Sequence, residues 1–210
     1  MSYQKARKDY ILHELWEKDC PSDPVELLDK WLHEAHSDSE DANAMMLSTV
    51  NEDHEPSNRI VLLRALNSDG IVFYTNYESD KGRQMGSNPN VALNFFWSWI
   101  ERQVRIQGRV ERLSDAESDT YFASRPRESQ IGAWASAQSS SIGSRQELDD
   151  AVRALEIKYN GVAIPRPKFW GGYLVRVRYF EFWQGRANRL HDRIAYTKNE
   201  MGWSIDRLSP

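Results

Sequence analysis

The sequence predicts a mainly β protein of the α+β class, an antiparallel barrel with peripheral helices. Apolar residues alternate with a period of two over much of residues 43–113 and again over 172–207. Short turns such as Asn67-Ser68-Asp69-Gly70 and Asn199–Gly202 join successive strands, as in antiparallel hairpins. A parallel doubly wound sheet would need a helix between most strands, and these intervals are too short for one.

Four helices are expected around the barrel. The first begins at Asp23, an N-cap followed by Pro24, and continues with apolar residues at helical spacing to about Ala35. A short helix starts near Ser79 and ends before Asn88-Pro89. Capping boxes at 114–117 and 144–147 open two more helices, the first of which must end before Pro126.

The strands are expected in two groups, about five before the capping-box helices and about three after them. They are Met45–Val50, Arg59–Leu66, Ile71–Thr75, Val91–Trp99 and Arg102–Leu113, then Gly172–Trp183, Leu190–Thr197 and Trp203–Arg207. The chain has no internal repeat and no long linker, so residues 23–210 are expected to form a single domain, preceded by an arm at 1–22.

Composition excludes several classes of protein. The 27 basic residues are outnumbered by 31 acidic ones, which argues against a generally basic nucleic-acid binder. Cys20 is the one cysteine, so neither an intrachain disulfide nor a cysteine-based metal cluster is expected. His33 and His36 have metal-ligand spacing but no evident third ligand, and no metal site is predicted. No apolar run reaches the ~18 residues that span a bilayer, and a cytoplasmic protein is expected.

Common nucleotide-binding and hydrolase motifs are also missing. The sequence contains no Gly-x-Gly-x-x-Gly, no Gly-x-x-x-x-Gly-Lys-[Ser/Thr] and no Gly-x-Ser-x-Gly. Dinucleotide-binding, P-loop and α/β-hydrolase folds therefore lose their main support.

Arg189, His191 and Arg193 form the strongest local cluster of candidate site residues. On a regular strand all three would project from one face. Three potential cations on one face repel one another, so they require a counter-ion, a ligand or solvent. Two interpretations follow: an edge strand paired with carboxylates, or a site for an anionic or electron-rich ligand.

A second candidate site lies around Pro126. Tyr121 and Arg125 are four residues apart on the predicted helix and share a face, and Ser129 follows in the turn. A phenol, a guanidinium and a hydroxyl at a helix end can bind a phosphate monoester, and a surface Tyr–Arg stack is the alternative.

Other cations flank apolar segments. Arg59 and Arg64 bracket a strand at odd spacing, so a regular strand directs them to opposite faces, where they reach two different anions or simply water. Lys81 follows a helix start, where backbone N–H groups favour an anion.

Ten short segments, in order along the chain, resemble the pyridoxine/pyridoxamine 5′-phosphate oxidase family. They are Arg59–Arg64, Phe73–Asn76, Glu101–Val104, Tyr121–Arg127, Ser129–Trp134, Gln138–Ser140, Phe169–Gly172, Glu181–Gly185, Arg189–Arg193 and Ile205–Pro210. The resemblance runs from about residue 23 to the C-terminus. It implies a split β-barrel of the type that binds flavin mononucleotide (FMN), acting as a homodimer with FMN at the subunit interface.

The resemblance also implies roles for individual residues. Contacts to FMN would come from Arg59, Ile60, Val61, Leu62, Leu63, Arg64, Tyr74, Thr75, Lys81, Gln103, Gln138, Ser139, Trp183 and Arg193. Substrate contacts would come from Arg64, Tyr121, Arg125, Ser129, Arg189, Leu190 and His191, with Arg7 and Tyr10 as a lid from the arm. Arg189 and His191 would be the catalytic residues, beside the pyridine ring.

The implied activity is oxidation of pyridoxine or pyridoxamine 5′-phosphate by O2 to pyridoxal 5′-phosphate, with release of H2O2 and, from the amine, ammonia. FMN carries the redox step, and the protein positions the substrate. The alternatives are a related split-barrel flavin oxidase with another substrate, such as a phenazine precursor, and a non-catalytic protein that binds FMN or pyridoxal phosphate.

Three positions depart from the family pattern. Arg64 stands where lysine is common, and Asp80 stands where an arginine often precedes the lysine matched by Lys81. Asp80 either weakens binding of the FMN phosphate or points away and favours the helix N-terminus. The segment 7–10 is only similar to the arm motif of the family.

Overall fold

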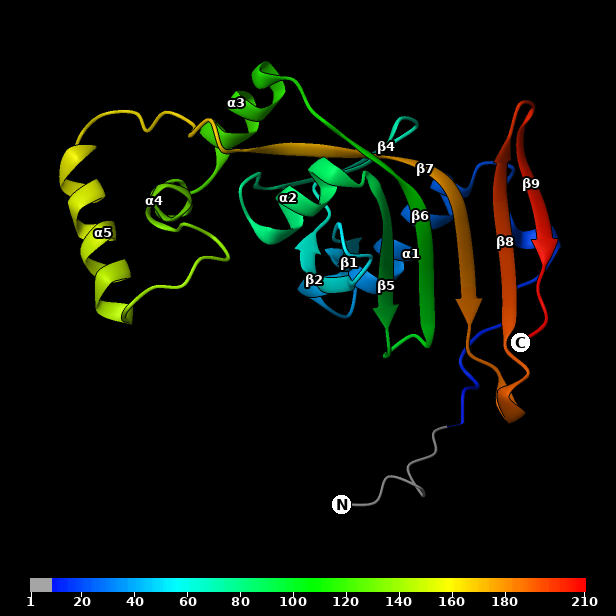
Figure 1. Ribbon diagram of the computed structural model, residues 1–210. Helices are drawn as coiled ribbons and strands as arrows, with labels where there is room; N and C mark the ends of the chain where they lie inside the picture. Colours follow the sequence, from blue (N-terminus) through cyan, green and yellow to red (C-terminus); the bar gives the residue numbers. More distant parts are fainter. Residues whose placement is uncertain (1–8) are drawn as a thin grey trace.

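The computed structural model describes residues 9–210, which form a nine-stranded antiparallel sheet curved into a split barrel, with five α-helices around it (Figure 1). The strands are β1 (Ala44–Val50), β2 (Pro56–Leu62), β3 (Ala65–Asn67), β4 (Gly70–Asn76), β5 (Asn90–Trp97), β6 (Arg102–Arg112), β7 (Trp170–Gln184), β8 (Asp192–Asn199) and β9 (Gly202–Arg207). The α-helices are α1 (Pro24–His36), α2 (Asp80–Ser87), α3 (Asp115–Ser124), α4 (Arg127–Ala135) and α5 (Arg145–Lys158). Three short 3₁₀ turns complete the chain: η1 (Glu17–Asp19), η2 (Glu40–Asn43) and η3 (Ala187–Arg189).

Strand β7 organises the sheet because it changes its neighbour halfway along. The order of strands is β2-β1-β5-β6-β7-β4-β3, and β8 and β9 continue from β7. The first part of β7, 170–175, pairs with β4, whereas its last part, 179–184, pairs with β8. Strand β6 lies along the other edge of β7 for nearly its whole length. In Figure 1, β8 and β9 therefore lie at one end of the molecule and helices α3, α4 and α5 at the other.

The core fills the barrel with large aromatic side chains. Phe73, Phe95, Trp97, Phe180 and Phe182 are all fully buried there. Helix α1 closes one side of the barrel, with the ring of Trp31 edge-on to Phe182 at 5.2 Å. A second, smaller cluster packs under α3, α4 and α5 and contains Phe122, Ile131, Tyr159, Ile164 and Trp170.

Most predicted helix starts are confirmed in detail. The Asp23 carboxylate accepts the Val25 N–H at the start of α1, and the Ser79 hydroxyl caps α2. The capping box at 114–117 is complete. At α5 the Ser144 hydroxyl accepts the Glu147 N–H, as expected for a capping box. The Glu147 carboxylate, however, accepts the N–H of Gly143 rather than that of Ser144, so this second bond of the predicted capping box is wrong.

The region after Pro126 differs from expectation. Helix α4 was not predicted, and Ser129, expected in a turn, lies within it. Pro126 ends α3 and then stands at the N-cap of α4, a place where its missing N–H costs little. Arg125 is beyond the last residue of α3 with extended dihedral angles, so it does not share a helical face with Tyr121.

Two predicted strands also need correction, and the first group has six strands rather than about five. The segment predicted as one strand, Arg59–Leu66, is divided because the chain changes partners. The Leu63 N–H donates to Asn43 on one side, and the next N–H, from Arg64, donates to Val72 on the other. Strand β8 begins at Asp192 rather than at Leu190, because Asn188 and Arg189 adopt positive φ angles of 57° and 62°. Arg189, His191 and Arg193 therefore do not share a face of one strand.

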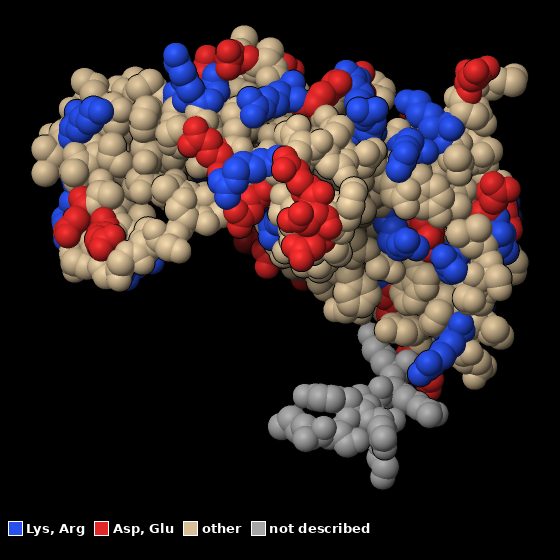
Figure 2. All heavy atoms as spheres, in the orientation of Figure 1, with Lys and Arg blue, Asp and Glu red and all other residues tan. Residues whose placement is uncertain are grey.

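Charges on the surface are mixed. Figure 2 shows lysine and arginine side chains interspersed with aspartate and glutamate on the face it presents. Within residues 9–210, no helix combines the length and apolar character needed to cross a membrane. The same residues contain no cluster of three or more histidine, cysteine or carboxylate side chains placed to hold a metal ion.

Candidate functional site

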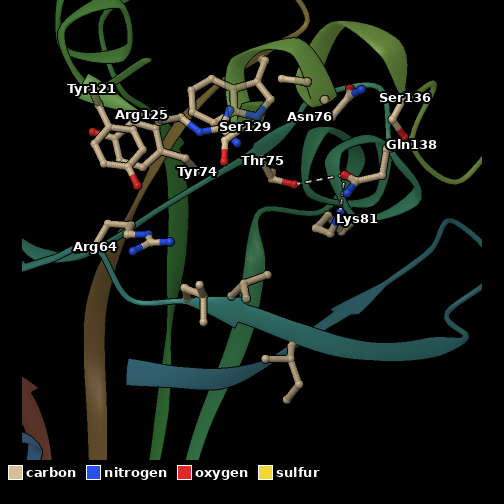
Figure 3. Close-up of a pocket in the computed structure, with 16 residues that line it drawn as sticks. Arg64, Tyr74, Thr75, Asn76, Lys81, Tyr121, Arg125, Ser129, Ser136 and Gln138 are labelled. Carbon is tan, nitrogen blue, oxygen red and sulfur yellow. Dashed lines mark hydrogen bonds between the residues drawn. The ribbon is translucent and has the colours of Figure 1, made fainter. Parts of the chain in front are cut away.

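A pocket of about 430 Å³ opens between strands β2 and β4 and helices α3 and α4 (Figure 3). Eleven of the predicted site residues line it: Ile60, Val61, Leu62, Arg64, Tyr74, Thr75, Lys81, Tyr121, Arg125, Ser129 and Gln138. In Figure 3, Tyr121, Arg125 and Ser129 gather toward one end of the pocket, and Thr75, Gln138 and Lys81 toward the other. We call these the Tyr121 end and the Lys81 end.

Lys81 is a buried cation at the first turn of α2. Only 7% of its surface is exposed, and its Nζ donates to Ser79 Oγ at 3.0 Å and to Gln138 Oε1 at 2.9 Å. The same Gln138 oxygen accepts the Thr75 hydroxyl at 3.3 Å. Burial, together with the nearby charge of Arg59, lowers the pKa of Lys81 to about 8.

Arg59 lies behind the Lys81 end and does not line the pocket wall. Its guanidinium donates to Ser57 Oγ at 2.7 Å and to the hydroxyl of Thr49. Burial lowers the pKa of Arg59, which stays protonated at any physiological pH. Its contribution to the pocket is therefore a fixed positive charge close to Lys81.

Arg125 supplies the cation at the Tyr121 end. Its guanidinium lies 4.5 Å from the centre of the Trp170 ring, and its Nη1 is buried without a hydrogen-bond partner. Burial lowers the pKa of Arg125, and the neighbouring charge of Arg64 acts in the same direction. An unpartnered buried guanidinium N–H is costly unless a ligand accepts from it.

The pocket thus holds two pairs of like charges, Arg59 with Lys81 and Arg64 with Arg125. Within the described part of the chain, none of the four forms an ion pair with a carboxylate, and the buried ones bond to neutral oxygens or to an aromatic ring. By contrast, Arg176 on the surface pairs with two carboxylates, those of Asp69 and Glu111. Two pairs of unneutralised cations are suited to two separate anionic groups.

Among the residues that the structure describes, Asp80 forms no ion pair with the pocket cations, although its charge acts against burial by raising the pKa of both Lys81 and Arg59. Its carboxylate is exposed, forms an ion pair with Arg83 on the outer side of α2, and stands in the first turn of the helix. This position corresponds to the second of the two outcomes considered for Asp80, in which the charge favours the helix N-terminus.

Four more of the predicted residues form a second group, on β6, β7, β8 and the connection that precedes β8. We call Gln103, Trp183, His191 and Arg193 the platform. The rings of Trp183 and His191 are 4.6 Å apart, and Tyr10 of the arm packs edge-on against both. Arg193 donates to Glu181 at 2.9 Å, and the other oxygen of this buried carboxylate binds Arg105 at 2.8 Å.

His191 is held by the connection between β7 and β8. Its Nδ1 accepts the backbone N–H of Arg186 at 3.1 Å, so the neutral ring carries its proton on Nε2. Burial lowers the pKa of His191, and the charge of Arg189 acts in the same direction. Arg189 and Leu190 are exposed beside it, in the strained turn η3.

Along β7, Trp183 of the platform lies far from the pocket of the same chain. Tyr74 of the pocket lies opposite Gly172 at the start of β7, and Trp183 is eleven residues (183 minus 172) further along the same strand. At ~3.3 Å per residue this is a separation of roughly 36 Å along the strand.

A few residues fall outside both groups. Leu63 and Ser139 do not line the pocket, and Arg7 lies outside the described residues. Five wall residues were not predicted: Asn76, Gly132, Ala133, Ser136 and Trp170. Trp170, which forms the wall behind Arg125, was present in the sequence as part of the segment 169–172, but its role depends on stacking that no spacing reveals.

The divided antiparallel sheet and the cationic pocket define a protein of the split-barrel class. PhzG from Burkholderia lata, crystallised with tetrahydrophenazine-1-carboxylic acid, superposes with a TM-score of 0.89 at 28% identity, covering 95% of this chain and 99% of that one. A pyridoxamine 5′-phosphate oxidase-related, FMN-binding protein from Nostoc punctiforme shares the fold, with a TM-score of 0.72 at 16% identity, covering 90% of this chain and 98% of that one.

Sequence comparison identifies the family. The family described as Pyridoxamine 5′-phosphate oxidase matches residues 32–159, and the Pyridoxine 5′-phosphate oxidase C-terminal dimerisation region matches residues 170–210. Pyridoxine/pyridoxamine 5′-phosphate oxidases from Christiangramia forsetii and Actinobacillus succinogenes are 50% and 47% identical, covering 97% and 100% of this chain and 96% and 100% of theirs. The chain therefore belongs to the pyridoxamine 5′-phosphate oxidase family of oxidoreductases.

Proposed function

We propose that this protein is an FMN-dependent oxidase that converts pyridoxine 5′-phosphate or pyridoxamine 5′-phosphate to pyridoxal 5′-phosphate. The alcohol substrate and O2 give the aldehyde and H2O2. The amine substrate also consumes water and releases ammonia. Curated relatives of about half-identical sequence carry this activity in their names, and they match essentially the whole chain.

The observation that carries the proposal is the pair of unneutralised cation sets in one pocket. FMN and the substrate each present a phosphate monoester, so the reaction needs two phosphate sites at a fixed separation. Arg59 and Lys81 would hold the phosphate of FMN, with Gln138 and Ser139 as further donors. Arg64 and Arg125, with the hydroxyls of Tyr121 and Ser129, would hold the phosphate of the substrate.

The residues present fit FMN. The Lys81 end offers a buried cation bonded only to neutral groups, together with the first turn of α2. Thr75 and Tyr74 continue from it along β4, and a flat ring would find an aromatic surface in Trp183 of the platform. When bound, FMN supplies the acceptor for a hydride from the C4′ carbon of the substrate and returns the electrons to O2.

The contribution of the protein is positioning and charge. The phosphate clamp at the Tyr121 end fixes one end of the substrate and so limits where its C4′ carbon lies. Arg189 would place a guanidinium against the pyridine ring and stabilise the charge that develops as hydride leaves. His191, neutral and protonated on Nε2, would donate a hydrogen bond that orients the ring.

A homodimer would bring the two groups of residues together. Within one chain, Trp183 lies eleven residues along β7 from Gly172, the register partner of the pocket residue Tyr74. We infer that the platform of one protomer, which lies within the matched dimerisation region apart from Gln103, completes the pocket of its partner. Residues 1–22 would act as an arm over this composite site, with Tyr10 as part of the cover.

One purification and one assay test the proposal. The purified protein is expected to carry bound FMN, to be dimeric, and to produce H2O2 with both phosphorylated substrates. Bound FMN without turnover of either substrate would favour a binding protein. Turnover of a non-phosphorylated substrate alone would favour a related flavin oxidase, against which the second cation pair argues.

A further inference from the structure

The arm is attached to the barrel mainly through its backbone. The Ile11 and Leu12 N–H groups donate to the buried carboxylate of Glu101 at 2.9 and 3.1 Å. The Leu15 N–H donates to Asp192 Oδ2 at 3.1 Å. Two carboxylates of the barrel thus fix the register of residues 11–15, which places Tyr10 beside Gly185 and over Trp183 and His191.

Asp192 binds two arginines as well as the arm. Besides the Leu15 N–H, its Oδ2 accepts Arg186 Nη1 at 3.0 Å, and its Oδ1 accepts Arg207 Nη1 at 2.8 Å. Only 14% of its side chain is exposed. One carboxylate therefore joins three separate segments: the arm, the β7–β8 connection and the C-terminal strand β9.

The two arginines extend the junction back to the arm. Arg186 also pairs with Glu14 at 2.7 Å, and Arg207 pairs with Glu17 and donates to the Leu15 carbonyl at 2.9 Å. Without the Asp192 carboxylate, both guanidiniums would lose the acceptor that orients them toward the arm. Such partly buried, charge-assisted hydrogen bonds are stronger than surface pairs.

The junction also reaches the platform. Arg186, whose side chain is fixed by Asp192, uses its backbone N–H to hold His191 Nδ1. Between these residues lie Asn188 and Arg189 with positive φ, a costly conformation that persists only where neighbouring contacts impose it. The carboxylate next to His191 in sequence is thus placed to set both the shape of the turn and the position of the arm.

We propose that Asp192 is a positioning residue that couples the arm to the β7–β8 connection, so that Tyr10 closes over His191 and Trp183. Asp192 does not touch the substrate in this proposal. It acts through Tyr10 and through the orientation of His191. The catalytic consequence rests on the proposed function, whereas the attachment of the arm does not.

The first test measures hydrogen–deuterium exchange in the cofactor-free protein. In Asp192→Asn, the protection factors of peptides covering residues 9–19 and 185–191 are expected to fall at least tenfold, while those of peptides from β5 stay unchanged. The matched control is Asp206→Asn, which removes an exposed carboxylate from β9 next to Arg207 and is expected to change neither segment. Unchanged protection of 9–19 in Asp192→Asn would overturn the proposal.

A second variant loosens the arm from its own side. Glu14→Gln combined with Glu17→Gln removes the partners of Arg186 and Arg207 at two half-exposed positions, so the core is not disturbed. It is expected to reproduce the loss of protection in 9–19. This double variant also keeps the proposal testable if Asp192→Asn fails to fold. Unchanged protection of residues 9–19 in the double variant would likewise contradict the proposed coupling.

The third test asks whether Asp192 acts through Tyr10. We expect Tyr10→Ala and Asp192→Asn each to raise KM for pyridoxine 5′-phosphate roughly tenfold with kcat within about twofold, and the double variant to be no worse than either single one. Additive effects would overturn the coupling. If the unmodified enzyme does not turn over this substrate, the proposed function fails, and the exchange measurement alone decides the role of Asp192.

Discussion

The rings of Tyr74 and Tyr121 stack with their centroids 3.7 Å apart and their planes within 15°. Tyr74 belongs to β4, and Tyr121 belongs to α3, so the stack fixes the helix against the strand at the mouth of the pocket. Trp170 lies behind both rings, nearly parallel to each. The contact links a residue expected to touch FMN with one expected to touch the substrate, so under the proposed function it would help to set the distance between the two phosphates.

Substitutions at Tyr121 should separate stacking from hydrogen bonding. Tyr121→Phe keeps the ring and removes the hydroxyl, so KM for pyridoxine 5′-phosphate should rise roughly tenfold with no change in unfolding free energy. Tyr121→Ala also removes the stack and should lower that free energy by about 1–3 kcal/mol. Steady-state kinetics and urea denaturation measure both. Equal stability loss in the two variants would contradict this assignment.

Arg125 should matter more for substrate than for cofactor. Arg125→Ala removes a buried, unpartnered guanidinium, so kcat/KM should fall about 10²-fold while FMN affinity changes less than threefold. Arg125→Lys keeps the charge but not the forked donors, so it should recover only part of the loss. Lys81→Met, at the other end of the pocket, is the converse control and should weaken FMN binding first.

The low pKa of Lys81 predicts a pH dependence for FMN binding. The amine has a pKa of about 8 in the cofactor-free protein, and an adjacent phosphate would raise it. FMN affinity should therefore fall as pH rises above about 8, by up to tenfold per unit. Fluorescence titration of the cofactor-free protein measures the change, and Lys81→Met should flatten the profile. An equally steep profile in Lys81→Met would assign the proton to another group.

The lowered pKa of Lys81 gives the folding stability of the cofactor-free protein the opposite pH dependence: stability rises with pH where FMN affinity falls. Because the folded chain holds the proton on Lys81 less tightly than the unfolded chain, charged Lys81 costs free energy of folding below pH 8. The cofactor-free protein should therefore regain that stability as pH rises from about 8 toward 10.5, the ordinary lysine value. Differential unfolding of wild type and Lys81→Met across this window isolates the contribution.

Gly82 and Gly86 both lie in α2 but differ in the space around them, so they make a matched pair for substitution by alanine. A Cβ at Gly82 would lie 2.1 Å from the Tyr77 carbonyl oxygen, whereas a Cβ at Gly86 would meet nothing within 4 Å. Gly82→Ala should push the helix away from β4 and cost about 1–3 kcal/mol, and FMN affinity should drop with it because Lys81 is adjacent. Gly86→Ala should stabilise the helix by about 0.5–1 kcal/mol. Thermal denaturation distinguishes them.

The sequence was most informative where local chemistry decides the structure. Strand alternation, the caps at Asp23, Ser79 and Ser114, and the final hairpin all depend on neighbouring residues, and all are confirmed. The antiparallel barrel with peripheral helices followed from the same alternation and from the absence of helices between most strands, whereas the split-barrel type followed only from the resemblance to a family.

The errors in the predicted strands and turns arose where contacts between residues far apart in the sequence decide the local structure. The break after Leu62 is set by bonds to Asn43 and Val72, which lie on different strands or turns. The turn at Asn188 and Arg189 has two successive positive φ angles without glycine; asparagine tolerates this conformation, but nothing in the sequence marked it at Arg189. The pairing of Arg59 with Lys81, and of Arg64 with Arg125, likewise depends on tertiary packing, and only the resemblance to a family grouped these residues in advance.

The distance between Tyr74 and Trp183 leads to the last prediction, which concerns how one site is shared by two chains. If each site combines the pocket of one protomer with the platform of its partner, Lys81→Met disables only the pocket and Trp183→Ala only the platform. Each variant alone should form inactive or weakly active dimers. When the two are mixed, unfolded and refolded together, half of the dimers combine them, and each such dimer has one intact site of two. About a quarter of wild-type activity should return.

The control joins both substitutions in one chain and refolds it with wild-type chains. Every site of the mixed dimer then carries one defect, so only the wild-type dimers should be active. Failure of the first mixture to regain activity, with mixed dimers demonstrated by mass spectrometry, would show that pocket and platform do not meet across the interface.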